Sequence, residues 1–342
     1  MSGPLENRYT RLVGIDHPVV QEGLGPYRTP KIAAAVSEAG GLGTVSMPGM
    51  PEDLGVGSRT FLSHIEECAS LTDKPFAVNI PVGVDRNGEV VAFTDVYIHA
   101  VLAARAADAG LAAQLKVMTT SAGFPGPYLG MIKDAGMVHQ HKVGSTRQAV
   151  KAAEAGVDVV IAAGFEMGGH APAAGVHTYV LVPSVTEAVD VPVLLTGGAR
   201  DGRGLAAALC MGADGVALGT RFILTMENVD WHPAYLNALL AAKEGDDVAF
   251  DGVYGPCRGL RNPASEALLA AQNSADADPT ALIRHKIESM QRAQLEGDTE
   301  HGLVMTGQVA GAIRDLVSVA DLVPGMVDEA RAVLDKLSRG FA

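Results

Sequence analysis

Two glycine turns give the clearest indication of chemistry in this sequence. Gly197-Gly198 and Gly219-Thr220 each follow a short apolar run, and the sequence between them is long enough for one helix and one strand. Backbone N–H groups exposed at such turns, one of which opens a helix, form a receptor for a phosphate group. The turns therefore predict a phosphate-bearing ligand. The alternative is that these glycines serve only tight connections between strands and helices.

A histidine follows a third glycine pair. His170 comes directly after Gly168-Gly169, and an imidazole on a glycine-rich loop can approach a ligand closely and transfer protons near neutral pH. The alternative is a histidine that only hydrogen-bonds loop backbone. His177 is a weaker candidate for the same role. His139 and His141, on alternate positions of one predicted strand, have no recognisable partner and are predicted to be structural.

Three charged residues lie close to these motifs in the sequence. Lys142 ends a predicted strand, where a cation could face an electron-rich ring or a developing anion. Glu166 could act as an acid or a base, although a glutamate on a loop is more often a solvated charge or a backbone cap. Arg221 could pair either with a phosphate or with a neighbouring carboxylate, and the sequence does not decide between the two.

The elements that must position these residues alternate regularly along the chain. Helical patterns such as Lys31–Ala39, Ser58–Leu71, Asp95–Ala109, Pro127–Ala135 and Ser145–Ala155 separate short branched apolar runs typical of buried parallel strands. The predicted strands are Val19–Gly23, Leu42–Ser46, Phe76–Ile80, Leu115–Thr119, Met137–Val143, Val159–Ala163, Val193–Thr196 and Gly215–Leu218. This alternation predicts an α/β fold, a (β/α)8 TIM barrel, in which the turns after the seventh and eighth strands lie side by side.

Residues 224–300 interrupt the alternation. Trp231–Lys243 and Ala275–Gly297 have helical patterns, Asp246–Asp251 reads as a loop or an edge strand, and Gly255–Pro263 reads as a turn-rich link. We expect a mostly helical insertion after the eighth strand that packs on one end of the barrel as a lid. The barrel itself would comprise residues 1–223 and 301–342, and helices at Val309 and after Pro324 would complete its outer ring.

Composition narrows the class of protein. The formal net charge of −13, from 39 acidic and 26 basic residues, disfavours a nucleic-acid or anionic-membrane partner. The cysteines Cys68, Cys210 and Cys257 lack the spacing of a disulfide framework or a zinc site, so no metal is expected. The polar N-terminus lacks a signal-peptide pattern, and no apolar run is long enough to span a membrane. We expect a cytoplasmic protein with a small-molecule substrate, and a homodimer as the assembly to test.

Three stretches in order resemble one family. HKVGSTRQAVKAAEAGVDVVIAAGFEMGGH, LVPSV and PVLLTGGARDGRGLAAALCMGADGVALGTRF, followed later by RGLRN and GQVAG, are similar to the nitronate monooxygenase (2-nitropropane dioxygenase) family of FMN-binding barrels. The resemblance implies that FMN is bound by a set of barrel-loop residues, and that His170 is the catalytic base or orients the substrate. The implied cofactor-binding residues are Gln21, Glu22, Gly23, Asn79, Lys142, Gly168, Gly169, Gly197, Gly198, Gly219 and Thr220.

The sequence departs from the family pattern near the expected flavin ring. Glu22 replaces a small residue, Leu24 replaces a methionine, Ala163 stands where some members have aspartate, and the segment after His170 is longer. The resemblance implies an FMN-dependent oxidoreductase that oxidises an alkyl nitronate-like carbon acid with O2. One alternative keeps the flavin, with NAD(P)H as electron donor and an enoyl thioester or quinone as acceptor. Another is a barrel that binds a phosphorylated ligand without redox chemistry.

Overall fold

Eight short parallel strands form the central sheet, in a computed structural model that describes residues 3–25, 27–49, 53–83, 91–252, 255–274 and 279–340. The strands run in the order β1-β9-β8-β6-β5-β4-β3-β2, and a parallel bridge between Val20 and Leu42 joins the two edges. The sheet is therefore a barrel, as the sequence predicts. Its strands are β1 (Val19–Gln21), β2 (Gly43–Ser46), β3 (Phe76–Val82), β4 (Leu115–Ala122), β5 (Val138–Val143), β6 (Val159–Ala163), β8 (Val193–Thr196) and β9 (Gly215–Leu218).

A short N-terminal helix closes the bottom of the barrel. Tyr9 and Val13 of α1 (Arg8–Val13) pack against inward-facing residues of the strands, and the Tyr9 side chain is fully buried. The Tyr9 hydroxyl donates to Oε1 of Gln140 at 2.9 Å inside the barrel. Because α1 fills the amino-terminal end of the barrel, a ligand can reach the barrel only at the carboxyl ends of the strands, where active sites of this fold lie.

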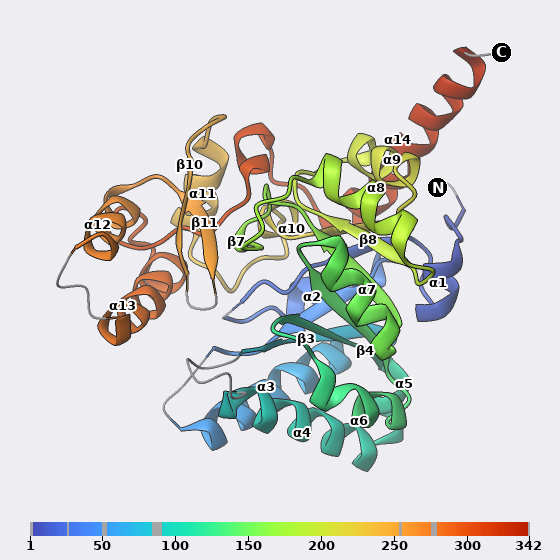
Figure 1. Cartoon of the computed structure of the whole chain (residues 1–342), viewed down its shortest axis with the longest axis horizontal. Coiled ribbons are helices and arrows are strands. Elements are labelled where there is room, and N and C mark those ends of the chain that lie inside the picture. The colour runs from blue at the N-terminus through green and yellow to red at the C-terminus, as the bar shows by residue number, and fades with distance from the viewer. Residues whose placement is uncertain are drawn as a thin grey trace.

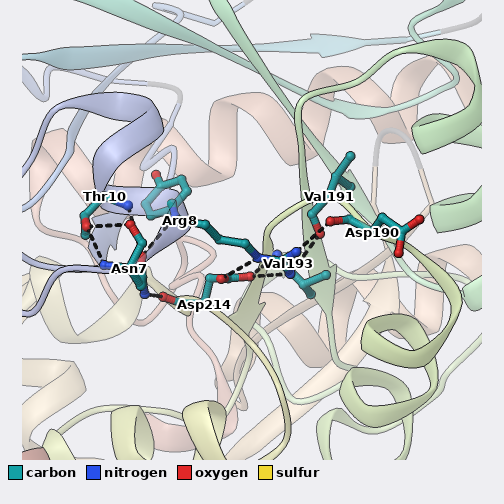
Figure 2. Close-up of polar contacts among 8 residues, drawn as sticks. Asn7, Arg8, Thr10, Asp190, Val191, Val193 and Asp214 are labelled. Carbon is teal, nitrogen blue, oxygen red and sulfur yellow. Dashed lines mark hydrogen bonds and ion pairs between the residues drawn. The ribbon is translucent and has the colours of Figure 1, made fainter.

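An ion pair fastens the same helix to two strands (Figure 2). Arg8 donates to both carboxylate oxygens of Asp214, at 2.7 and 2.9 Å, and to the backbone oxygen of Asp190. Asp214 precedes β9, and its Oδ2 also accepts the N–H of Val193 at the start of β8, at 2.9 Å. One buried carboxylate therefore holds α1, β8 and β9 in register.

Helices surround the barrel in the order that the alternating pattern predicts. Ser145 caps the N-terminus of α7 by accepting the N–H of Gln148, and Gly156 ends the helix in the left-handed region with φ of 103°. Among the described residues, no helix combines the length and apolar character needed to cross a membrane. The surrounding helices are α2 (Pro30–Glu38), α3 (Leu54–Leu71), α4 (Ala92–Ala107), α5 (Ala109–Gln114), α6 (Leu129–Asp134), α7 (Thr146–Ala155), α8 (Thr178–Ala188) and α9 (Gly202–Cys210).

The segment after β9 contains a small sheet as well as helices (Figure 1). Strands β10 (Asp247–Asp251) and β11 (Pro256–Leu260) form an antiparallel pair, so the prediction of a turn-rich link over 255–263 is wrong. The sequence signal failed there because β11 contains proline, arginine and glycine, and it gains its partner strands only in the folded chain. The helices of this segment are α10 (Thr220–Ile223), α11 (Pro233–Ala241), α12 (Pro263–Gln272) and α13 (Pro279–Gln291). The helix start predicted at Ala275 lies outside the described residues.

The C-terminal region differs from the two predicted helices. The turn at Val309 is a short 3-10 helix, Gln308–Ala312, and the last helix, α14 (Val319–Gly340), begins before Pro324. Its N-terminus is fixed by Ser318, whose hydroxyl accepts the N–H of Asp321, and by Glu227, whose carboxylate accepts the N–H of Val319. The helix therefore begins at these contacts and includes Pro324.

Candidate active site

The carboxyl ends of the barrel strands open into a cavity of about 400 Å3. Gln21 lies in the wall behind it, where its side-chain amide donates to the backbone oxygen of Thr44 at 2.9 Å. The other residues that the sequence predicts for the site all line the cavity: Glu22, Gly23, Asn79, Lys142, Gly168, Gly169, His170, Gly197, Gly198, Gly219 and Thr220. The fold thus brings together residues from four barrel loops and from the strands β3 and β5.

The two glycine turns form one polar corner of the cavity. Gly197 and Gly198 have φ of 106° and 83°, a conformation that side chains strongly disfavour, so their backbone bends tightly after β8. Beside them, the hydroxyl of Thr220 accepts the N–H of Gly307 at 3.0 Å, so that its own proton can be donated to a ligand oxygen. This corner can hold a phosphate group with backbone N–H groups and one hydroxyl.

The loop that follows residues 224–300, a segment called the excursion below, forms the other side of this corner. A Cβ atom at Gly168 would lie 2.4 Å from the backbone N of Gly307, so only glycine lets the two loops touch. Gln308 N donates to the backbone oxygen of Glu166 at 3.0 Å across the same contact. Sequence reasoning did not assign Thr306 or Gly307 to the site, although the GQVAG stretch that begins at Gly307 is part of the family resemblance.

A lysine and a glutamate meet on the cavity wall. Nζ of Lys142 lies 2.7 Å from Oε2 of Glu22, and the side chain of Glu22 is buried. Oε1 of Glu22 is enclosed and has no hydrogen-bond partner among the described residues. Next to this pair, a Cβ atom at Gly23 would lie 2.5 Å from Oδ1 of Asn79, so glycine is required there for the Asn79 side chain to reach the wall.

The position of His170 is set by the small sheet. Gly169 and His170 form β7 (Gly169–His170), which pairs antiparallel with β11 so that His170 lies opposite Cys257. Ala171 N also donates to the backbone oxygen of Pro256 at 2.8 Å. Burial, with smaller effects of the Lys286 and Lys142 charges, lowers the pKa of His170 to about 4. The imidazole is therefore uncharged at neutral pH and can accept a proton.

A buried arginine fixes the small sheet to the barrel. Arg258 of β11 donates to the backbone oxygen of Phe165 at 3.0 Å, stacks over the Phe165 ring at 4.7 Å, and pairs with Asp247 of β10. Phe165 belongs to the loop that follows β6 and continues into β7. Because the barrel loop and the excursion are held together in this way, His170 is positioned by both.

The other charged candidates have structural partners. The carboxylate of Glu166 accepts the N–H and the hydroxyl of Thr178, which confirms the capping alternative, and it contacts the exposed His177 at 3.3 Å. Arg221 pairs with Asp315 at 2.7 Å, so the carboxylate alternative is the one observed.

His139 and His141 are confirmed as structural residues. A ring nitrogen of each lies 2.8 Å from the Thr120 hydroxyl, which the two imidazoles share. Both side chains are buried, and neither residue lines the cavity.

The excursion and the loop that follows it supply an apolar part of the cavity wall that the sequence did not predict. Tyr235 is one residue of this apolar wall. Its side chain is buried, and its hydroxyl donates to the backbone oxygen of Met305 at 2.9 Å. Their side chains carry no motif, and only the folding of the excursion onto the barrel brings them to the site. The residues are Trp231, Tyr235, Ile287, Met290 and Met305.

Comparison with known proteins agrees with this architecture. The chain is 33% identical to the "(3aS,4S,5R,7aS)-5-hydroxy-7a-methyl-1-oxo-octahydro-1H-indene-4-carboxyl-CoA dehydrogenase" of Rhodococcus jostii (strain RHA1), over 97% of this chain and 98% of that protein. It is 28% identical to a "Probable nitronate monooxygenase" of Staphylococcus saprophyticus, over 97% and 99% of the two chains.

A solved structure and a family model also match nearly the whole chain. FabK from Thermotoga maritima superposes with a TM-score of 0.86 at 34% identity, covering 99% of this chain and 100% of that chain. The family model "NMO: Nitronate monooxygenase" matches residues 6–329. This relationship disagrees with the alternative of a barrel without redox chemistry. The chain belongs to the nitronate monooxygenase family and is an oxidoreductase enzyme of this flavin-dependent family.

Proposed function

We propose that this protein is an FMN-dependent oxidoreductase that acts on an acyl thioester, with NAD(P)H or its oxidised form as the second substrate. The observation that carries the proposal is the composition of the cavity wall. One corner can hold a phosphate group, and an uncharged histidine lies on the loop beside it. Ile287 and Met290 of the excursion, with Met305 of the loop that follows it, add an apolar surface. An acyl group can pack against that surface, whereas a small nitronate would leave it unused.

The residues of the cavity fit the flavin nucleotide. The turns at Gly197-Gly198 and Gly219-Thr220 would hold its phosphate through backbone N–H groups and the Thr220 hydroxyl. Gly23 and Gly168 keep the wall clear of Cβ atoms where backbone or Asn79 lies close. When bound, FMN supplies a two-electron carrier that accepts or returns hydride.

His170 would move the proton that accompanies the hydride. Oxidation of an acyl thioester takes a proton from the carbon beside the carbonyl and a hydride from the next carbon, leaving a double bond. The uncharged imidazole can accept that proton, and in the direction of reduction it returns a proton to the same carbon.

The relatives support the same substrate class. The similar Rhodococcus protein is named as a dehydrogenase of a ring-bearing carboxyl-CoA, and this chain aligns with nearly all of it. A CoA thioester presents an uncharged carbonyl next to the reacting carbons. We therefore propose the same type of reacting group here, without assigning the acyl chain.

Oxidation of an alkyl nitronate with O2 is the second candidate. Lys142 places an ammonium group at the cavity, where it could attract an anion, and some relatives are named as probable nitronate monooxygenases. The two candidates differ in the charge of the reacting group and in the electron donor.

Anaerobic spectrophotometry of the FMN-loaded protein separates the candidates. We expect NADH or NADPH to bleach the oxidised flavin band, and crotonyl-CoA or cyclohexene-carboxyl-CoA to restore it, while propyl-2-nitronate leaves the band unchanged. Bleaching by the nitronate, with no response to any thioester, would favour the second candidate instead. Recovery of the protein with a stoichiometric flavin other than FMN would contradict the cofactor assignment.

A further inference from the structure

We propose that Glu22 excludes anionic reacting groups from the cavity by holding the charge of Lys142. The inference deepens the proposed function, since it gives a reason why an uncharged thioester would be preferred over a nitronate. It makes Glu22 a specificity-determining residue, a role that does not follow from its position in a strand or a turn.

Lys142 and Glu22 form a close ion pair. Nζ of Lys142 lies 2.7 Å from Oε2 of Glu22, within the normal range of a charge-assisted hydrogen bond. The side chain of Lys142 is 16% exposed and that of Glu22 is 6% exposed, and both residues line the cavity. The cation can therefore be reached from the cavity, but its countercharge is already in place.

No other described residue offers Glu22 a second cation. Oε1 of Glu22 has no hydrogen-bond partner in the described part of the chain, so Lys142 alone balances the carboxylate. The two cations near β7 are engaged elsewhere, because Arg258 pairs with Asp247 and Lys286 donates to the backbone oxygen of Gly252 at 3.0 Å. An anion that drew Lys142 away would leave Glu22 as an uncompensated buried charge, which is strongly unfavourable.

The net charge of the side chains that line the cavity also disfavours an anionic reacting group. Lys142 is the one lysine or arginine among the described residues that line it, whereas two glutamates, Glu22 and Glu166, are present. His170 adds no charge at neutral pH. The side chains of the cavity therefore carry no net positive charge with which to attract an anionic reacting group.

Removing the charge of Glu22 tests this role without a catalytic assay. In the FMN-loaded protein, binding of nitrate and of propyl-2-nitronate is titrated by calorimetry and by perturbation of the flavin spectrum. We expect Glu22→Gln to bind both anions on the order of tenfold more tightly than the wild type, because Lys142 loses its countercharge. Glu22→Asp keeps the charge and is expected to bind them as weakly as the wild type.

The double variant Glu22→Gln/Lys142→Met identifies the cation responsible. It is expected to lose the gained affinity, since the ammonium group is gone. Flavin content and circular dichroism verify folding, and Glu22→Ala provides a second neutral variant if Glu22→Gln does not fold. Equal anion affinity in the wild type and both neutral variants would overturn the proposal, as would a gain that persists in the double variant.

The result is distinguishable from failure of the proposed function. If no thioester reacts with the wild type but the neutral variants gain anion affinity, the substrate assignment fails and the role of Glu22 stands. If thioesters react but anion affinity does not change, the substrate assignment stands and the role of Glu22 fails.

Discussion

The hydroxyl of Thr220 accepts a hydrogen bond from the backbone N–H of Gly307, at 3.0 Å, across a sequence separation of 87 residues. This bond joins the turn after the last barrel strand to the loop through which the chain returns from the excursion. Thr220 also lines the cavity, so one side chain both fixes the corner and can donate to a phosphate oxygen.

Replacement of Thr220 by valine should weaken FMN binding. The variant keeps the shape of the side chain but loses the donor to the phosphate and the acceptor for Gly307. A hydrogen bond to a charged group contributes about 1.5–3 kcal/mol, so the dissociation constant should rise about 10- to 100-fold. Flavin fluorescence on dilution measures this change, and Thr220→Ser should restore most of the affinity.

The matched control is Thr225→Val. Thr225 is also buried and donates to the backbone oxygen of Phe222 at 2.8 Å, but it does not line the cavity. This variant should lose about 1 kcal/mol of stability and keep its flavin affinity. Equal loss of flavin by both variants would mean that Thr220 acts only through folding.

Replacement of His170 by alanine should leave FMN bound and lower turnover by roughly 100-fold or more, the contribution typical of general acid–base catalysis. Burial lowers the pKa of His170 to about 4, so wild-type turnover that depends on the uncharged imidazole should fall only as the pH approaches 4. Steady-state rates over a pH series measure both effects. His177→Ala, which removes an exposed side chain outside the cavity, should retain wild-type turnover. If His170→Ala keeps full activity, the histidine is structural.

Acid should destabilise the protein through its buried histidines. Burial lowers the pKa of His139 to about 3 and that of His141 to about 4, from a usual value of 6.5. Between pH 6.5 and 4 the unfolded chain binds more protons, so the free energy of unfolding is highest above pH 6.5 and falls as the pH drops. Each histidine contributes a slope of up to about 1.4 kcal/mol per pH unit.

Urea unfolding at pH 7 and pH 5 measures this effect. His139→Gln/His141→Gln should lose less stability between the two pH values than the wild type, because two of the groups that take up protons on unfolding are removed. His99→Gln is the control, since His99 is exposed beside Asp95. A pH dependence that is unchanged in the double variant would show that other groups cause it.

Replacement of Asp214 by asparagine should loosen the bottom of the barrel. The amide cannot balance Arg8 and cannot accept all three N–H groups that contact the carboxylate. Because Arg8 is 45% exposed, solvent screens part of the loss, and we expect about 1–2 kcal/mol of destabilisation in urea unfolding. Arg203→Gln removes a surface ion pair with Asp201 and should leave the midpoint unchanged. An Asp214 variant as stable as that control would contradict the assigned role.

The barrel could be read from the sequence because its signals are local. The runs Val159–Ala163, Val193–Thr196 and Gly215–Leu218 are observed as strands with the same ends as predicted. Short branched apolar segments bounded by glycine, proline or aspartate leave little choice of structure or length. The site followed from the barrel, since residues that come after parallel strands must meet at one end.

The excursion could not be read in the same way because its structure depends on distant partners. β7 has two residues, Gly169 and His170, and exists only because it pairs with Cys257 and Arg258. The pairing of Lys142 with Glu22 likewise joins β5 to the residue that follows β1, and neither residue's neighbours in sequence indicate it. The sequence does not predict the apolar wall from Tyr235 to Met305, because these residues meet only after the chain has folded back over the barrel.

The pairing of β7 with β11 has a consequence for how this enzyme can diverge. Successive residues of a strand face opposite sides, so a shift of one position against β11 would turn the His170 side chain away from the ligand. Insertions or deletions in β11 could therefore redirect the reactive side chain while every barrel residue stays the same. In a chimera of two relatives, exchange of residues 247–260 would change the direction in which the His170 side chain points. Exchange of the barrel loop alone would not.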